Sequence, residues 1–338
     1  MIRKIQILCC LVFLSTFSLF AQYTETINSN RPGSSQGAFA VGNQVLQFEL
    51  GLGLGKEKHE LLNSDANAFT IDYAIRYGFL KERLEVNAIG TYQRNSVTIT
   101  QGLATANFNQ ANFKINTLGA KYLLYDPYRK RDLEGPNLYS WKANNKFQWR
   151  DLIPAISVYA GANLDFSDNP FTPELESSIS PKLVISTQNN WSGGWVFVTN
   201  IIVDRVTTDF PSYGYILTLT HAFNEKISVF AENQALISDF YSDQLFRGGG
   251  AYLISNDLQL DASFLLNFKD TPSRTFGYIG VSYRIDMHKK DEFIEEKSGS
   301  DDDSTGSKKD KKKKKRKSRK RKDDIDLDDD GGSENLLN

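Results

Sequence analysis

The chain has 338 residues, of which 40% are hydrophobic and 24% are charged, and its formal net charge is -1. Its mean hydropathy of -0.42 leaves no apolar run of about 20 residues beyond the N-terminus, which excludes an α-helical membrane protein. The near-zero net charge is a sum over two dense, opposite blocks near the C-terminus, so the total says little about partners.

The first 21 residues have the pattern of a secretory signal peptide. Arg3 and Lys4 precede an apolar run over residues 5–20, and Ala21 offers a small residue for cleavage before Gln22. A retained N-terminal membrane anchor is the alternative. Both cysteines lie inside this segment, so we expect a mature chain without disulfides, thiol chemistry or a lipid anchor.

Residues 22–43 form a polar lead-in, which we expect on the periplasmic side. It contains Asn30-Arg31-Pro32-Gly33, which predicts an ordered turn because proline presets φ and glycine permits the left-handed region. Residues 44–55 then alternate with a period of two, with leucines and Phe48 on one face and Gln47 and Glu49 on the other.

The same alternation recurs along the chain, and short turns alternate with longer links. The longer links include long polar loops expected over residues 56–67 and 94–112. This pattern is typical of a meander that closes into an outer-membrane barrel, with its short turns in the periplasm. We therefore predict an all-β fold, a transmembrane antiparallel β-barrel of about 12 strands over residues 44–286, with a secreted β-sandwich as the alternative. The predicted strands cover residues 44–55, 69–77, 84–92, 114–125, 155–164, 179–188, 195–203, 213–222, 227–234, 244–254, 258–267 and 275–285.

The link over residues 126–153 is longer than a periplasmic turn should be. It contains Trp141, Phe147 and Trp149 and the basic run Arg129-Lys130-Arg131. We expect a short interfacial helix or a plug element there, and two additional strands are the alternative.

Charged and polar residues of both signs occupy the inward parity of the predicted strands. They either pair across strands to fill a narrow lumen or form a polar pathway, since twelve strands enclose more space than side chains fill. The lumen-lining candidates are Glu49, Asp72, Arg76, Glu85, Lys121, Lys182, Glu232, Arg247, Asp261 and Arg284.

Catalytic and metal-binding constellations do not emerge from the sequence. The three histidines are distributed between the two ends of the predicted barrel, with His59 in an outer loop and His221 and His288 at the opposite end. A hydrolase would need a nucleophile, a base and an acid on one rim. The glycines at 248–250 lie in mid-strand without a following helix, so they do not form a phosphate loop. We expect no enzyme activity, no cofactor and no metal.

Five short motifs stand out between residues 24 and 285. They are Arg31-Pro32-Gly33, Gln47-Phe48-Glu49-Leu50-Gly51, Gly119-Ala120-Lys121-Tyr122, Glu232, and Gly280-Val281-Ser282-Tyr283-Arg284. With these motifs the chain resembles the meta-pathway phenol-degradation transporter family of outer-membrane barrels, a distant relation of the long-chain fatty acid porins. The resemblance implies uptake of aromatic or other apolar small molecules. The Phe-Ala-Gln cleavage site is similar to secretion signals of Bacteroidota. Barrels of this type commonly end at their last strand, whereas this chain continues for about fifty residues past Ile285.

Residues 287–338 form a charged tail that has too few apolar residues to fold alone. A basic block at residues 308–322 lies between two acidic stretches. Because the signal peptide removes nucleic acid as a partner, the tail is either a solvated tether or a contact for an anionic periplasmic partner or peptidoglycan. The candidates for that contact are Lys311, Lys312, Lys313, Lys314, Lys315 and Arg316.

We therefore expect an outer-membrane barrel surrounded by lipid that acts as a porin-like conduit for small, apolar or aromatic molecules. The alternative is a non-transporting barrel that serves as a docking component of an envelope complex through its tail.

Overall fold

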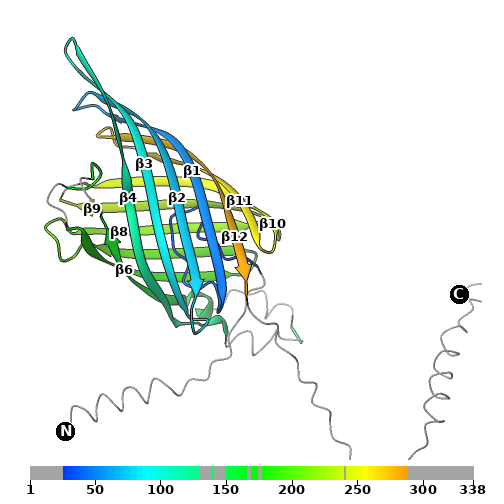
Figure 1. Ribbon diagram of the computed structural model, residues 1–338. Coiled ribbons are helices and arrows are strands. Elements are labelled where there is room, and N and C mark those ends of the chain that lie inside the picture. Colours follow the sequence, from blue (N-terminus) through cyan, green and yellow to red (C-terminus); the bar gives the residue numbers. More distant parts are fainter. Residues whose placement is uncertain are drawn as a thin grey trace, which may run out of the picture. The chain divides into compact units, whose positions relative to one another are not determined.

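The computed structural model describes residues 26–129, 139–140, 149–165, 169–173, 177–239 and 241–287. Each strand in this part of the chain pairs antiparallel with its neighbours in sequence, and β1 pairs with β12, which closes the sheet (Figure 1). The predicted all-β, twelve-stranded barrel is confirmed. The strands are β1 Val45–His59, β2 Ser64–Gly78, β3 Leu84–Gln101, β4 Ala104–Tyr125, β5 Ala155–Leu164, β6 Ile179–Trp191, β7 Trp195–Asp204, β8 Ser212–Ala222, β9 Ile227–Ser238, β10 Asp243–Ser255, β11 Leu258–Asn267 and β12 Ser273–Asp286.

The period of two in each strand separates an apolar outer surface from a buried, largely polar interior. In β1, Gln47 and Glu49 are buried, whereas Phe48, Leu50 and Leu52 are exposed on the outside. Soluble monomers rarely expose a large contiguous apolar surface, while an outward apolar band is typical of barrels surrounded by lipid. Exposed tyrosines flank this band near one end of the barrel, at Tyr122, Tyr252 and Tyr283.

The two ends of the barrel differ in their connections. One end, here called the turn end, carries short turns between β2 and β3, β6 and β7, β8 and β9, and β10 and β11. The other end, here called the loop end, carries the connections that lead from an odd-numbered strand to the next even-numbered strand, such as the one between β1 and β2. Consecutive strands must alternate direction in a meander, so the chain enters β1 and leaves β12 at the turn end.

The predicted long loops over residues 56–67 and 94–112 are wrong, because most of these residues continue the strands. The β1–β2 pairing extends to His59 and Ser64, and the β3–β4 pairing extends to Gln101 and Ala104. Figure 1 shows the β3–β4 hairpin projecting past the rest of the barrel. These extensions lack apolar alternation since both of their faces meet water there, while the backbone hydrogen bonds continue.

In the described part of the 126–153 link, a short 3-10 helix, η1 Trp149–Leu152, precedes β5. The ring of Tyr128 packs on Phe39, with 6.0 Å between ring centroids, and its hydroxyl accepts a 2.6 Å hydrogen bond from the Asn190 N–H. Neither Trp141 nor Phe147 lies within the described residues, and the same holds for the signal peptide and for the tail from residue 288 onward. No helix in the described ranges is both long and apolar enough to cross a bilayer.

Candidate functional site

Residues 26–43, here called the inner segment, lie inside the barrel. The Ile27 N–H donates to the Asn256 carbonyl (2.7 Å) in the β10–β11 turn, and the Gln44 N–H donates to the Gly78 carbonyl (3.0 Å) at the end of β2. Between these points the segment bonds to inward side chains of most strands, and in Figure 1 it appears within the ring of strands. The sequence predicted a periplasmic lead-in and gave it no place within the lumen, where the structure puts its described residues. The reason is that the polar inward side chains supply the partners that its exposed backbone needs.

Three contacts hold the middle of the inner segment to the barrel strands, and Arg31 makes the first of them. Its Nε and NH2 groups donate to the two Asp261 carboxylate oxygens at 3.2 and 3.0 Å, and its NH1 lies 3.9 Å from Asp72. A Cβ atom on Gly51 or Gly280 would fall within 3.0 Å of this guanidinium, so both glycines are needed to let it lie flat on the β1–β12 pair. The two parallel hydrogen bonds fix the orientation of the Arg31 guanidinium, and the Asp261 carboxylate neutralises its charge.

Glu232 on β9 makes the second contact. It accepts hydrogen bonds from the backbone N–H groups of Ser34 (3.0 Å) and Ser35 (3.2 Å), and it pairs with Arg247 on β10. A Cβ atom on Gly33 would lie 2.7 Å from Oε2 of Glu232, so this close approach requires glycine. Glu232 is 4% exposed, and its carboxylate also accepts a hydrogen bond from the Thr218 hydroxyl (2.8 Å).

Asn200 on β7 makes the third contact. Its side-chain amide bonds to both backbone groups of Gln36, as the backbone of a neighbouring strand would. Its Oδ1 accepts from the Gln36 N–H (2.7 Å) and its Nδ2 donates to the Gln36 carbonyl (2.8 Å). Two residues later, the Ala38 N–H donates to Oε1 of Gln188 on β6 (3.0 Å). Inward side chains of β6 and β7 thus provide the hydrogen bonds that a neighbouring strand would otherwise give the backbone of the inner segment.

A buried ion cluster holds the last part of the inner segment near the turn end. Arg76 contacts Glu85 at 2.9 Å and Glu49 at 3.0 Å, and Lys121 lies 3.3 Å from Glu85. Lys121 also donates to the carbonyls of Gly37 (3.0 Å) and Phe39 (2.8 Å). The cluster contains two cations and two carboxylates, so each charge removed from water has an opposite partner.

The remaining two predicted lumen residues lie apart from this cluster. Lys182 is 3.7 Å from Asp204 and faces the cavity described next. Arg284 lies at the turn end, 3.8 Å from Asp257 and 3.3 Å from Asp286. All ten predicted positions therefore face inward, but they divide among the inner-segment contacts, the buried cluster, the cavity and the turn end.

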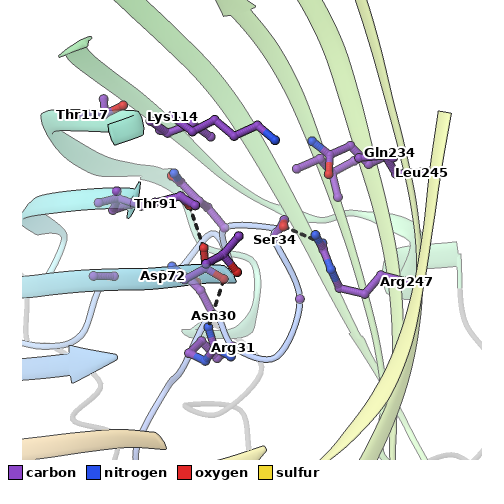
Figure 2. A pocket seen from close by; sticks show the side chains of 18 of the residues that line it. Asn30, Arg31, Ser34, Asp72, Thr91, Lys114, Thr117, Gln234, Leu245 and Arg247 are labelled. Carbon is purple, nitrogen blue, oxygen red and sulfur yellow. Dashed lines mark hydrogen bonds and ion pairs between the residues drawn. The ribbon is translucent and has the colours of Figure 1, made fainter. Parts of the chain in front are cut away.

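A cavity of about 360 Å³ lies in the lumen, bounded on one side by the inner segment. Polar groups of β2 to β4 line one part of it, including Asp72, Thr91 and Lys114 (Figure 2). The opposite part is lined by inward apolar residues of β6 to β12, here called the apolar wall. It consists of Val184, Ile202, Ile216, Leu245, Leu265 and Phe276.

Sequence reasoning missed the apolar wall because it assumed a wholly polar interior. A signal was present in the adjacent apolar pairs, such as Val184-Ile185 and Ile201-Ile202, since a strand with one wet face should not place apolar residues on both parities. It also did not include Arg31 among the lumen residues, because it assigned the lead-in no contacts within the lumen.

The two described histidines lie at opposite ends of the barrel. His59 accepts a hydrogen bond from the Leu62 N–H (3.3 Å) at the loop end, while His221 stacks on Trp195 (4.2 Å between centroids) at the turn end. Within the described ranges, no group of three or more metal-binding side chains gathers. His288 and the tail candidates at residues 311–316 lie outside those ranges, so the tail contact stays a prediction. No observation favours the docking role over the conduit.

Comparison with known proteins supports a family assignment. The model of a family described as putative MetA-pathway of phenol degradation matches residues 29–285. A search of curated proteins found no match. Similar solved structures include an outer membrane channel from Pseudomonas putida F1, at 9% identity and a TM-score of 0.47, covering 77% of this chain and 100% of that one. Others are the CymD monoaromatic hydrocarbon channel (10% identity, TM-score 0.40, covering 73% and 90%) and the Pseudomonas putida toluene transporter TodX (11%, 0.37, 72% and 90%).

Proposed function

The chain belongs to the putative MetA-pathway of phenol degradation family, and from this premise we propose that it is an outer-membrane conduit for small, largely apolar molecules of aromatic size. The observation that carries the proposal is the cavity of about 360 Å³, whose exposed surface is mainly apolar although polar and charged side chains also line it. Binding sites for small molecules have this composition, with apolar contacts for affinity and sparse polar groups for orientation.

The size of the cavity sets the scale of the solute. An apolar cavity of about 150 Å³ holds one benzene molecule, so the lumen has room for a substituted ring or for two rings. Larger solutes such as oligosaccharides would not fit while the inner segment occupies the lumen.

Neighbouring residues of β8 provide a matched test. Ile216 faces the cavity and is 3% exposed, whereas Leu217 faces outward. We expect Ile216→Trp to reduce uptake of labelled benzamide strongly, because the indole occupies the cavity. Leu217→Trp should retain uptake, since tryptophan is tolerated on a lipid-facing surface.

The measurement is the initial rate of benzamide uptake by cells of an outer-membrane-bearing host that express each variant. Heat-modifiable migration on gels reports the amount of folded barrel, which normalises the rates. The conduit would be refuted if the wild type and both variants took up benzamide at the same rate. It would also be refuted if cells without the protein took it up as fast as cells with the wild type.

A further inference from the structure

Lys114 on β4 differs from the other basic residues that line the cavity. Its ammonium donates to the neutral Oε1 of Gln93 at 3.0 Å, and no carboxylate among the described residues lies within 4.0 Å of it. The other basic groups of the cavity do have carboxylate partners. These pairs are Arg31 with Asp261, Lys182 with Asp204, Arg247 with Glu232, and Arg274 with Glu57.

A β-bulge places Lys114 in the lumen. Thr91 pairs with Ile115 and Tyr92 pairs with Phe113, so the ladder between β3 and β4 skips Lys114. Bulges commonly redirect one side chain out of the regular alternation. Figure 2 shows the result, since the Lys114 side chain extends into the cavity toward Gln234 on the opposite side.

The surroundings of the ammonium favour an anion. The carboxylates that line the cavity already have other partners. Asp72 accepts a 2.7 Å hydrogen bond from the Thr91 hydroxyl and lies 3.9 Å from Arg31, while Glu57 pairs with Arg274 and Glu49 with Arg76. Across the cavity from Lys114 lie Gln234, Leu245 and Arg247 (Figure 2). A cation that is partly removed from water and lacks a fixed counter-charge binds an incoming anion more strongly than a neutral group.

We propose that Lys114 is the anion-binding residue of the cavity and that the solute class is small aromatic acids. The carboxylate of the solute lies at Lys114, with the Gln234 amide beside it, and the ring lies on the apolar wall. This inference rests on the proposed function, because it names the solute of the same cavity. The inference also explains the role of the bulge, which turns the Lys114 side chain into the cavity.

Equilibrium binding of a matched pair of probes tests the inference. Benzoate and benzamide have nearly the same size and shape, but only benzoate is an anion at neutral pH. We expect the purified full chain in detergent to bind benzoate more tightly than benzamide by equilibrium dialysis. Lys114→Gln should weaken benzoate binding by about tenfold, as expected for loss of a hydrogen bond to a charged group. Benzamide binding should change less than twofold.

Two further variants complete the design. Lys114→Arg keeps the positive charge and should retain most of the preference for benzoate. Lys58→Gln removes an equal charge from an exposed position of the β1 extension and should have no effect on either probe. The undiminished benzamide binding of Lys114→Gln would also show that the variant is folded around an intact cavity.

The outcomes separate this inference from the conduit itself. Equal loss of both probes in Lys114→Gln, or no preference for benzoate in the wild type, would overturn the anion site. So would the absence of binding by either probe when cellular uptake of benzamide is normal, and in that case the conduit would stand without this site. Loss of uptake for every solute would count against the conduit instead.

Discussion

Gly51 and Gly280 lie directly opposite each other across the β1–β12 pair, and the Arg31 guanidinium occupies the space that a side chain on either would need. Both glycines therefore serve one contact, the bidentate pair between Arg31 and Asp261. We expect Gly51→Ala to displace Arg31 and to lower the free energy of unfolding by about 1–3 kcal/mol, the usual range for overpacking. Urea titration of the folded barrel measures this change.

A double-mutant cycle isolates the cause of that loss. In an Arg31→Ala background, Gly51→Ala should cost far less, because the group it would clash with is gone. Gly277→Ala is the matched control on the paired strand β12, since a Cβ atom there would meet nothing within 4 Å. A loss for Gly51→Ala that is independent of Arg31 would show that the glycine serves the strand and not the inner segment.

Arg76 neutralises two buried carboxylates, and it is 0% exposed. Replacing it by alanine leaves Glu49 and Glu85 with only Lys121 nearby, so we expect a loss of about 3–5 kcal/mol of stability, as for other broken buried ion pairs. Arg94→Ala, at an exposed position of β3, should stay within about 0.5 kcal/mol of the wild type. Similar urea midpoints for the two variants would contradict the structural importance of the cluster.

Leu217 lies at the middle of β8 and faces outward. If the apolar band is surrounded by lipid, Leu217→Arg should destabilise the barrel by about 2–4 kcal/mol, because the guanidinium enters the hydrocarbon near its midplane. Leu62→Arg provides the control, since Leu62 is exposed in the β1–β2 turn beyond the band. Folding into lipid vesicles, followed by urea titration, measures both. Equal costs would show that the band does not face hydrocarbon.

The strands could be predicted from the sequence because lipid outside and polar groups inside impose opposite demands on successive residues. β8 shows this clearly, with Leu217 and Leu219 outward and Thr218 inward between them. Where that contrast disappears, the prediction failed. The extensions of β1 to β4 meet water on both faces, so they looked like loops.

The interior was harder to predict because it depends on contacts between distant parts of the chain. Nothing local in Arg31-Pro32-Gly33 reveals that Arg31 meets Asp261, 230 residues away. The inward position of Lys114 depends on a bulge, which shifts parity by one residue. The only trace in the β4 sequence is that apolar residues change from odd positions, Phe113 and Ile115, to even positions from Leu118 onward. The charged candidates were assigned to the inward face from strand parity, which determines the face wherever no bulge interrupts the strand.

The orientation of the barrel in the outer membrane gives the final prediction. Leu103 and Asn107 are exposed on the β3–β4 hairpin at the loop end, and Asn256 lies in a tight turn at the turn end. Short turns of such barrels face the periplasm. With the signal peptide removed, the chain has no cysteine, so single substitutions can be labelled without background. Leu103→Cys and Asn107→Cys should react with a membrane-impermeant maleimide on intact cells, while Asn256→Cys should react only after the outer membrane is permeabilised. Labelling of Asn256→Cys alone on intact cells would reverse the orientation, and the solute would then meet the inner segment before the apolar wall.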